Sequence, residues 1–441
     1  MEASCRIEKD IKLVSSEVFP VFCRKDTSAF TRKRKLPCDR LVITTLCRKG
    51  RSMSMELRGF EKVGATEKVS TAGYLKAREK LNPEALWVLA CYHAKNVYSS
   101  NDAASYKGHL LLAVDGTSMN VPTNEETIRV YGNTSSHGRP QATCGLSVAF
   151  DTLNRQIVNT TVNRAGFDER GQVKAHLDIL GDVIGKRPFM LVMDRGYQSV
   201  ALIVELEAAG IPYVIRCSSR FLSKEFDLAE TCGSDVTSKI EFTRNRLSWA
   251  KKKNPKAYEK MRSGAPVSAR FVLIDIGGDV PERIVTNLPQ DEFSALDLKE
   301  IYHLRWNIET CFSMLKDKLQ AENFTGTKPH LIEQDIFATT YLLNVAYDLA
   351  NEADRKLQKN GRLSTYKHEM TVNKGFAMGV VKEELIHIIL APVEERREML
   401  LAVVSELERN LVPVRKDRSY ERVSGGAPRH NRYSNTHKRV F

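Results

Sequence analysis

The chain has 441 residues, with 67 Lys and Arg against 54 Asp and Glu and a formal net charge of +13. Its length predicts two or three domains, and its positive charge favours a polyanionic partner. Nine scattered cysteines without a CxxC pair argue against a disulfide framework or a zinc site, and no apolar run approaches membrane-spanning length. The first residues also lack the apolar core of a signal peptide, so we expect a soluble, cytoplasmic protein.

The positive charge is concentrated at the two ends of the chain. Residues 1–60 hold 14 basic and 7 acidic residues, residues 414–441 hold 8 and 2, and the stretch between them has no net charge. Residues 1–105 have helical patterns and a basic cluster at 32–35, which predict a helical region with a basic face suited to nucleic acid. A solvated helical leader is the alternative. The basic tail, 414–441, is polar and rich in turn formers, and we expect it to be disordered without a partner.

The pattern changes from helices to strands at His109. The run HLLLAVDGT is continuously apolar up to its aspartate, as in a strand buried on both faces. Two strand patterns at 144–151 and 155–163 are joined by a short turn and predict a hairpin. Helix, strand, helix and strand patterns follow at 171–184, 189–194, 199–209 and 211–217. This order predicts an α/β fold with a mixed sheet of the ribonuclease H-like kind.

The segment 218–294 interrupts this α/β order. Near its end, SARFVLIDIGG and ERIVTNLP read as two strands around a Gly277-Gly278 turn, and a basic arm before them carries Trp249. We therefore predict a β-rich insertion that divides the sheet domain between 106–217 and 295–352. Helical patterns in 353–413 predict a helical C-terminal region before the tail.

The stretch from Leu298 to Gln320 has no Pro or Gly and predicts one long helix. On a helical wheel, four polar side chains fall within a sector of roughly 60°, beside an apolar stripe that suits packing on a sheet. The four are Tyr302, Arg305, Glu309 and Lys316. The simple alternative is a solvated helix edge on which Arg305 and Glu309 form an i,i+4 pair.

Two further acids favour a catalytic role for that helix. Asp115 and Asp194 each end an apolar strand-like run, and in a ribonuclease H-like sheet such strand ends can lie side by side. Singly, each has an ordinary explanation, since Asp before Gly often forms a turn and Asp194 could pair with Arg195. Together with Glu309 they form a set of three carboxylates suited to metal-assisted phosphoryl transfer on DNA. Asp115 would bridge two Mg²⁺ ions, for which Mn²⁺ could substitute, and Asp194 and Glu309 would each complete one ion.

These residues carry a resemblance to a known family. The array Tyr302-x2-Arg305-x3-Glu309-x6-Lys316 is similar, at full spacing, to the signature of bacterial insertion-sequence transposases of the "insertion sequence 4" family. Asp115 in VDGTS and Asp194 in MDRGY resemble the family's first and second acidic motifs. The resemblance implies a ribonuclease H-like catalytic domain with a β-rich insertion, and a helical N-terminal region that binds double-stranded DNA at the inverted ends of the element.

The same resemblance implies cut-and-paste chemistry by an Asp-Asp-Glu triad, cleaving and joining element ends to target DNA. Arg305 and Lys316 would hold phosphates, Tyr302 would donate to a phosphate oxygen, and a homodimer would pair the two ends. Family members commonly use a hairpin intermediate in which an aromatic stacks on a flipped base, and Trp306 and Trp249 are the candidates. Trp306 could also be a core residue.

Two other functions remain open from the sequence. One is a structure-selective nuclease on the same fold that hydrolyses DNA without joining it, and the other is a DNA-binding regulator with a silent catalytic core. Strand transfer into target DNA separates the transposase from the nuclease, and Mg²⁺-dependent nicking would exclude the regulator.

Overall fold

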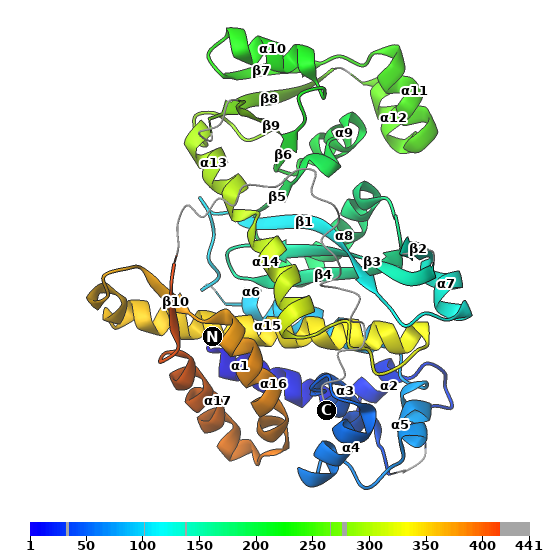
Figure 1. Ribbon diagram of the computed structural model, residues 1–441. Helices are drawn as coiled ribbons and strands as arrows, with labels where there is room; N and C mark the ends of the chain where they lie inside the picture. The colour runs from blue at the N-terminus through cyan, green and yellow to red at the C-terminus, as the bar shows by residue number, and fades with distance from the viewer. Residues whose placement is uncertain (32–34, 101, 137–138, 265, 276–279, 415–441) are drawn as a thin grey trace.

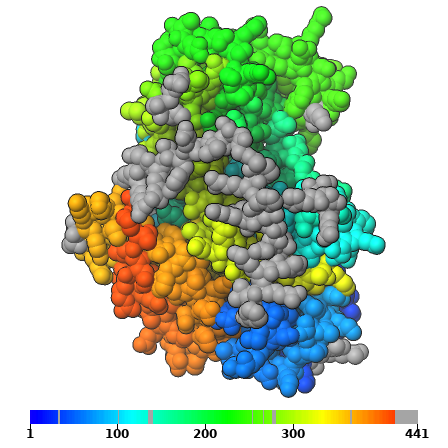
Figure 2. Space-filling view, viewed as in Figure 1, coloured from blue at the N-terminus to red at the C-terminus, as the bar shows by residue number. Residues whose placement is uncertain are grey.

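The computed structural model describes residues 1–414 except 32–34, 101, 137–138, 265 and 276–279. A central sheet lies above a long helix, α15 (Pro329–Lys359), with the insertion at one end of the molecule and the terminal helices at the other (Figure 1). The space-filling view shows the insertion at the top, the N-terminal helices at the lower right and the C-terminal helices at the lower left (Figure 2). No helix in the described ranges is long and apolar enough to cross a membrane.

The central sheet has the predicted ribonuclease H-like topology. Strand β3 pairs antiparallel with both β1 and β4, and β1, β5 and β6 run parallel to one another. The predicted hairpin is β3 and β4, and the predicted helices are α8 and α9, so the expected fold class is confirmed. The bounds are β1 (Leu110–Asn120), β3 (Arg139–Asp151), β4 (Gln156–Arg164), α8 (Glu169–Ile184), β5 (Phe189–Met193), α9 (Val200–Ala208) and β6 (Tyr213–Cys217).

The burial of β1 agrees with its apolar sequence. Residues 110–114 are all buried, and alternate side chains enter hydrophobic clusters on opposite faces of the sheet. Ala113 lies in the cluster that includes α15, whereas Leu112 and Val114 lie in the cluster that includes α8 and α9. A strand covered on both faces is rigid, and Asp115 directly follows this covered segment.

The insertion extends the central sheet. Strand β9 pairs antiparallel with β6, and β8 and β7 continue the same sheet outward. The two predicted strands are β8 and β9, and the glycine turn expected between them lies outside the described residues. Helices accompany the strands, and the basic arm with Trp249 forms α11 and α12. The bounds are α10 (Ser223–Thr231), β7 (Asp235–Ile240), α11 (Arg244–Lys253), α12 (Pro255–Ser263), β8 (Val267–Ile274) and β9 (Glu282–Thr286).

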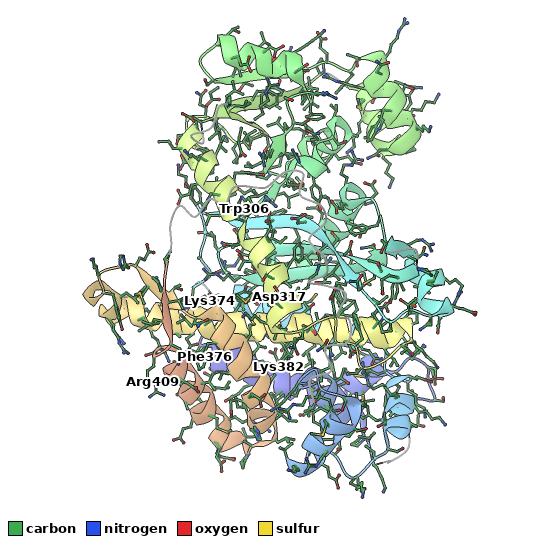
Figure 3. All side chains as sticks on the ribbon, in the orientation of Figure 1. Trp306, Asp317, Lys374, Phe376, Lys382 and Arg409 are labelled. Carbon is green, nitrogen blue, oxygen red and sulfur yellow. The ribbon has the colours of Figure 1, made fainter. Side chains whose placement is uncertain are left out.

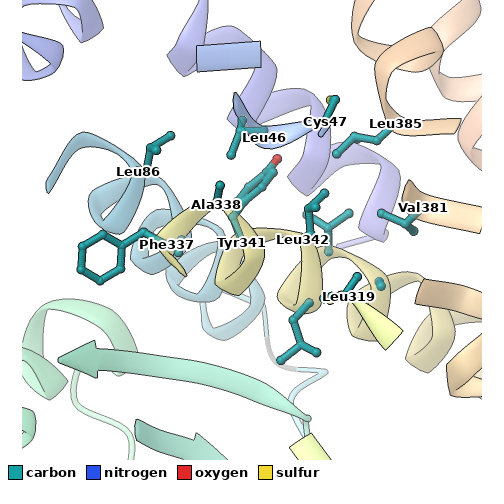
Figure 4. Close-up of a cluster of buried hydrophobic side chains, with 14 of the residues drawn as sticks. Leu46, Cys47, Leu86, Leu319, Phe337, Ala338, Tyr341, Leu342, Val381 and Leu385 are labelled. Atoms are coloured by element: carbon teal, nitrogen blue, oxygen red, sulfur yellow. The ribbon is translucent and has the colours of Figure 1, made fainter. Parts of the chain in front are cut away.

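Both terminal regions are helical, as predicted, and both pack on α15 (Figure 1). Figure 4 shows Tyr341 and Leu342 of α15 among side chains from the N-terminal helices, such as Leu46, and from the C-terminal helices, such as Leu385. Helix α15 continues without a break through residue 352, where we expected the catalytic domain to end. The helices with most of these contacts are α1 (Ala3–Val14), α3 (Cys38–Leu46), α6 (Pro83–Tyr98), α16 (Lys374–Leu390) and α17 (Val393–Leu407).

The remaining described elements are short or peripheral, apart from the helices that carry the candidate site. They are α2 (Phe19–Cys23), α4 (Met53–Lys62), α5 (Thr71–Arg78), α7 (Glu125–Tyr131), β2 (Asn133–Ser136), η1 (Arg195–Tyr197), η3 (Arg362–Thr365), β10 (Met370–Val372) and β11 (Leu411–Pro413).

A buried carboxylate on α15 fixes the N-terminal region. Asp335 is fully buried and forms ion pairs with Arg78 at 2.8 Å and Arg48 at 3.4 Å, and it accepts a hydrogen bond from the Thr325 amide at 2.8 Å. The two guanidinium groups and this amide hold the pKa of Asp335 below its usual value although burial alone would raise it. Such a buried ion pair adds little net stability by itself, because burial of the charges is costly. Removing one partner is strongly destabilising, because the other charge is then buried without compensation.

We predict that Asp335→Asn lowers the free energy of unfolding by about 3–5 kcal/mol, because it leaves two buried arginines without their shared counter-charge. Urea denaturation at pH 7 measures the loss. Asp178→Asn, on the exposed side of α8, is the control and should change stability by less than about 0.5 kcal/mol. Equal stabilities of the two variants would contradict this role of Asp335.

Candidate active site between strands β1 and β5 and helix α14

Two aspartates lie where the parallel pairing of β1 with β5 stops. Asp115 is within β1, which continues to Asn120 paired with β3, so the prediction that Asp115 ends a strand is wrong, whereas Asp194 directly follows β5. In the parallel ladder of β1 and β5, Val114 pairs with Met193, so the next residues of the two strands, Asp115 and Asp194, lie side by side. Asp115 Oδ1 accepts a hydrogen bond from the Gly116 amide at 2.8 Å, and Asp194 Oδ1 accepts one from the Gly196 amide at 2.7 Å. Backbone hydrogen bonds therefore orient both carboxyl groups.

The third acid lies on a helix that is not continuous, so the prediction of one unbroken helix over 298–320 is wrong. Helix α13 (Ala295–Leu304) ends before Arg305, α14 (Asn307–Ser313) begins after Trp306, and a π-helical turn η2 covers Met314–Lys318. At the junction, the amides of Arg305 and Trp306 bond to carbonyls three residues back.

The interruption has a packing cause. The apolar side chains of α13, Leu298 and Ile301, belong to the small cluster with β8 and β9, whereas Ile308 and Phe312 of α14 belong to the large cluster with α15. The helix thus changes the core on which it packs at the junction. Asn307 anchors this point by donating a hydrogen bond to the carbonyl of Thr152, at 3.0 Å, in the turn between β3 and β4.

Arg305 connects the first and third acids. Its guanidinium donates to Asp115 Oδ2 at 3.2 Å and to Glu309 Oε1 at 2.9 Å, so the i,i+4 pair expected from the sequence is present together with a second pair. Arg305 is 4% exposed and lies 5.6 Å from the centre of the Tyr302 ring. The structure therefore brings Asp115, Arg305, Glu309 and Tyr302 together at one place.

The other predicted contacts are distributed around this centre. Lys316 Nζ donates to Thr117 Oγ1 and to the Ser118 carbonyl, both at 2.7 Å, and burial lowers its pKa. Tyr302 is buried, and Arg216 approaches its ring at 5.9 Å. In this structure, Lys316 therefore forms hydrogen bonds with β1, and Tyr302 packs within the protein.

The two tryptophans are each 42% exposed. Trp306 lies at the junction of α13 and α14, which Figure 3 shows in front of the central sheet near β1, and its exposure shows that it is not a core residue. Trp249 lies on α11, with the Arg170 guanidinium 5.4 Å from its ring centre. Trp249 also lines a groove of about 870 Å³ that contains Glu169 and Gly196 and the basic residues Lys174, Lys256 and Lys260.

Burial has the largest effect on the pKa of Asp115. Desolvation raises the pKa of Asp115 to about 6, with further increases from the charges of Asp194 and Glu169, while the Gly116 amide and Arg305 act in the opposite direction. Glu169 also feels the charge of Asp194. Neither Glu169 nor Tyr197 was among the predicted site residues. Tyr197 belongs to the MDRGY motif, which could have indicated it. Glu169 lies near the start of a predicted helix, where an acid is common, so its sequence context does not indicate a site.

Comparison with known proteins identifies the family. The family model described as "Transposase DDE domain" matches residues 106–345, which include the whole site and more than half of the chain. The chain belongs to this family. The protein is therefore a DDE transposase, an enzyme that cuts DNA and transfers its strands, and the predicted kind of protein is confirmed.

Two relatives in sequence agree with this assignment. The transposase InsG of insertion sequence element IS4 from Escherichia coli K12 is 20% identical over 364 residues, covering 80% of this chain and 76% of that protein. The transposase of element IS421 from Escherichia coli is 36% identical over 80 residues, 18% of this chain and 20% of that protein. A solved piggyBac transposase synaptic complex with hairpin DNA is 11% identical, with a TM-score of 0.45 over 94% of this chain and 88% of that chain.

The raised pKa of Asp115 gives a prediction about stability without metal. Because its folded pKa, about 6, exceeds its ordinary value of 3.8, ionised Asp115 costs roughly 2 to 3 kcal/mol of stability above pH 6. The cost is absent below pH 3.8 and develops between the two values. We expect Asp115→Asn to be more stable than the wild-type transposase at pH 7.5 and to lose this advantage toward pH 4.

Urea denaturation in the presence of a chelator, repeated across this pH range, measures the difference. The exposed Asp178→Asn variant should follow the wild type throughout. An Asp115→Asn variant whose stability relative to wild type does not change with pH would show that the carboxyl titrates normally.

Proposed function

We propose that this transposase cleaves and transfers the ends of its own element by a cut-and-paste reaction, with Asp115, Asp194 and Glu309 as the catalytic triad. The observation that supports this assignment most is the convergence of three elements: the middle of β1, at Asp115, lies beside the end of β5, and Arg305 links Asp115 to Glu309 of α14. Asp115 and Asp194 occur in the order of the family's two acidic motifs, and Glu309 has the spacing of the family's array of Tyr, Arg, Glu and Lys.

The donors of the site suit a divalent cation. Carboxylate oxygens are the ligands that Mg²⁺ prefers, and the Arg305 guanidinium already places a cation between Asp115 and Glu309. No three Asp, Glu, His or Cys side chains of the described residues are yet close enough to hold an ion. We therefore propose that Arg305 turns away from these acids when the site is loaded with two Mg²⁺ ions, or with Mn²⁺. Such ions activate the attacking water or 3′-hydroxyl and neutralise charge on the leaving oxygen.

Protein side chains would position the DNA around the acids. Arg305 would exchange its carboxylate partners for a phosphate, and Lys316 would hold a phosphate beside β1. Tyr302 would support Arg305 with its ring, 5.6 Å from the guanidinium, and donate to a phosphate oxygen. The exposed Trp306 and Trp249 offer stacking surfaces on two sides of the site. The lysines of the groove beside Trp249 supply positive charge for a DNA strand.

Binding of element ends is assigned to the helical N-terminal region, and a homodimer would pair two ends. The net charge of +7 over residues 1–60 supports contact with the terminal inverted repeats. Strand transfer into target DNA distinguishes this proposal from a structure-selective nuclease, and metal-dependent nicking distinguishes it from a silent DNA-binding regulator.

The decisive experiment is cleavage of a supercoiled plasmid carrying the native element, with Mg²⁺. Glu309→Gln keeps the size of the side chain and removes one metal-binding charge, so we expect loss of excision products by at least about a hundredfold. Glu398→Gln, on the exposed surface of α17, should cut as the wild type does. Cleavage by Glu309→Gln at the wild-type rate would refute the triad.

A second prediction concerns stacking by Trp249. Trp249→Ala should weaken binding of an element end with an unpaired terminal base by about 1–3 kcal/mol, because a stacking surface is lost. Fluorescence anisotropy measures the affinity, with Leu228→Ala as the control, since Leu228 is also an exposed apolar residue of the insertion. Equal affinities of the two variants would remove Trp249 from the DNA contacts.

A further inference from the structure

Glu169 lies against the backbone next to both proposed catalytic aspartates. It is the first residue of α8. A Cβ atom added to Gly116, which follows Asp115, would meet Glu169 Oε1 at 2.5 Å, and one added to Gly196, two residues after Asp194, would meet Glu169 Oε2 at 3.7 Å. One carboxyl group therefore reaches the backbone beside both aspartates, and the missing side chain of Gly116 leaves the space that this carboxyl group occupies.

The Glu169 carboxyl has no counter-charge of its own. Among the described residues it forms neither an ion pair nor a hydrogen bond, although it is about half-buried and its pKa is raised by burial and by the charges of Asp194 and Asp168. Arg305 neutralises the Asp115 and Glu309 side of the site. On the other side of the site, neither Asp194 nor Glu169 forms an ion pair with a described residue, although the groove beside Glu169 also contains Lys174, Lys256 and Lys260.

A buried hydroxyl gives an independent indication at the same place. Tyr197 is 0% exposed, and its hydroxyl has no hydrogen-bond partner among the described residues. The charges of Asp115, Glu169 and Asp194 all act on this phenol. A buried hydroxyl normally has a partner, and a phenol surrounded by carboxylates that do not bond to it suits a water molecule of a hydrated cation.

We propose that Glu169 is a fourth carboxylate ligand of the divalent cation site, acting with Asp115 and Asp194, and that the Tyr197 hydroxyl binds a water of that cation. The inference rests on the proposed metal-dependent function. It adds a ligand from α8, on the side of the site opposite to Glu309. Mg²⁺ takes oxygen ligands and keeps several of its waters, so carboxylates that lie apart from one another can hold it partly through those waters.

The test is the affinity for Mn²⁺ of the full-length protein without DNA, measured by titration calorimetry. Three variants each remove one charge: Glu169→Gln, Asp115→Asn and the matched control Asp168→Asn. Asp168 is the neighbouring acid, but it is exposed and its carboxylate faces Arg170 at 3.5 Å. We expect Glu169→Gln and Asp115→Asn to bind Mn²⁺ at least about tenfold more weakly than wild type, and Asp168→Asn to bind it within about twofold.

Thermal unfolding in a chelator shows that each variant is folded, and Glu169→Gln should unfold at or above the wild-type temperature because a repulsive charge is removed. Glu169→Asp, which keeps the charge, should retain more Mn²⁺ affinity than Glu169→Gln. Wild-type affinity in Glu169→Gln alongside weak binding in Asp115→Asn would overturn the role of Glu169 alone. An equal loss in Asp168→Asn would also overturn it, since general charge would explain the effect. Unchanged affinity in Asp115→Asn would overturn the proposed metal site itself.

Discussion

The parallel pairing of β1 with β5 is the constraint on which the site depends. Two parallel neighbours cannot be joined by a tight turn, so the chain must leave the sheet and return through a crossover connection. Here the connection contains the β3–β4 hairpin and α8, and it returns the chain to β5 in register with Val114 opposite Met193. The same crossover that places Asp194 beside Asp115 also brings the start of α8 next to both aspartates. Placement of Glu169 is therefore a consequence of the topology.

Arg305 resolves the electrostatic problem that this placement creates. Several carboxylates gathered at a partly buried position on the sheet repel one another, and burial further disfavours their charge. The guanidinium compensates two of them with a fixed fork of donors, and its own position is set by the junction of α13 and α14, where the helix passes from one hydrophobic cluster to the other. Packing of the two half-helices thus determines where the compensating charge lies.

The sequence was sufficient for the elements with strong periodicity. Sequence patterns predict the apolar run that ends at Asp115, the hairpin, and the strand that ends before Asp194. Continuous apolar runs of this length indicate buried strands, and two strand patterns around a short turn indicate a hairpin. The junction at Arg305 could not be predicted, because it arises from two separate cores and the local sequence favours continuous helix. The position of Glu169 could not be predicted either, because its proposed role depends on a contact with Gly116 across 53 positions of the chain. Burial of Tyr302 and the engagement of Lys316 with β1 likewise follow from tertiary packing.

The pairing of β9 with β6 bears on how this transposase could lose or gain its insertion. An inserted segment joined only by loops could be excised and leave a closed surface. Here the segment supplies the partner of a buried central strand, so its removal would leave β6 as an open edge with unpaired amide and carbonyl groups, a template for aggregation with other chains. A variant without the insertion would therefore need another strand to pair with β6. The stability of the sheet favours keeping the insertion, independently of any contact that it makes with DNA.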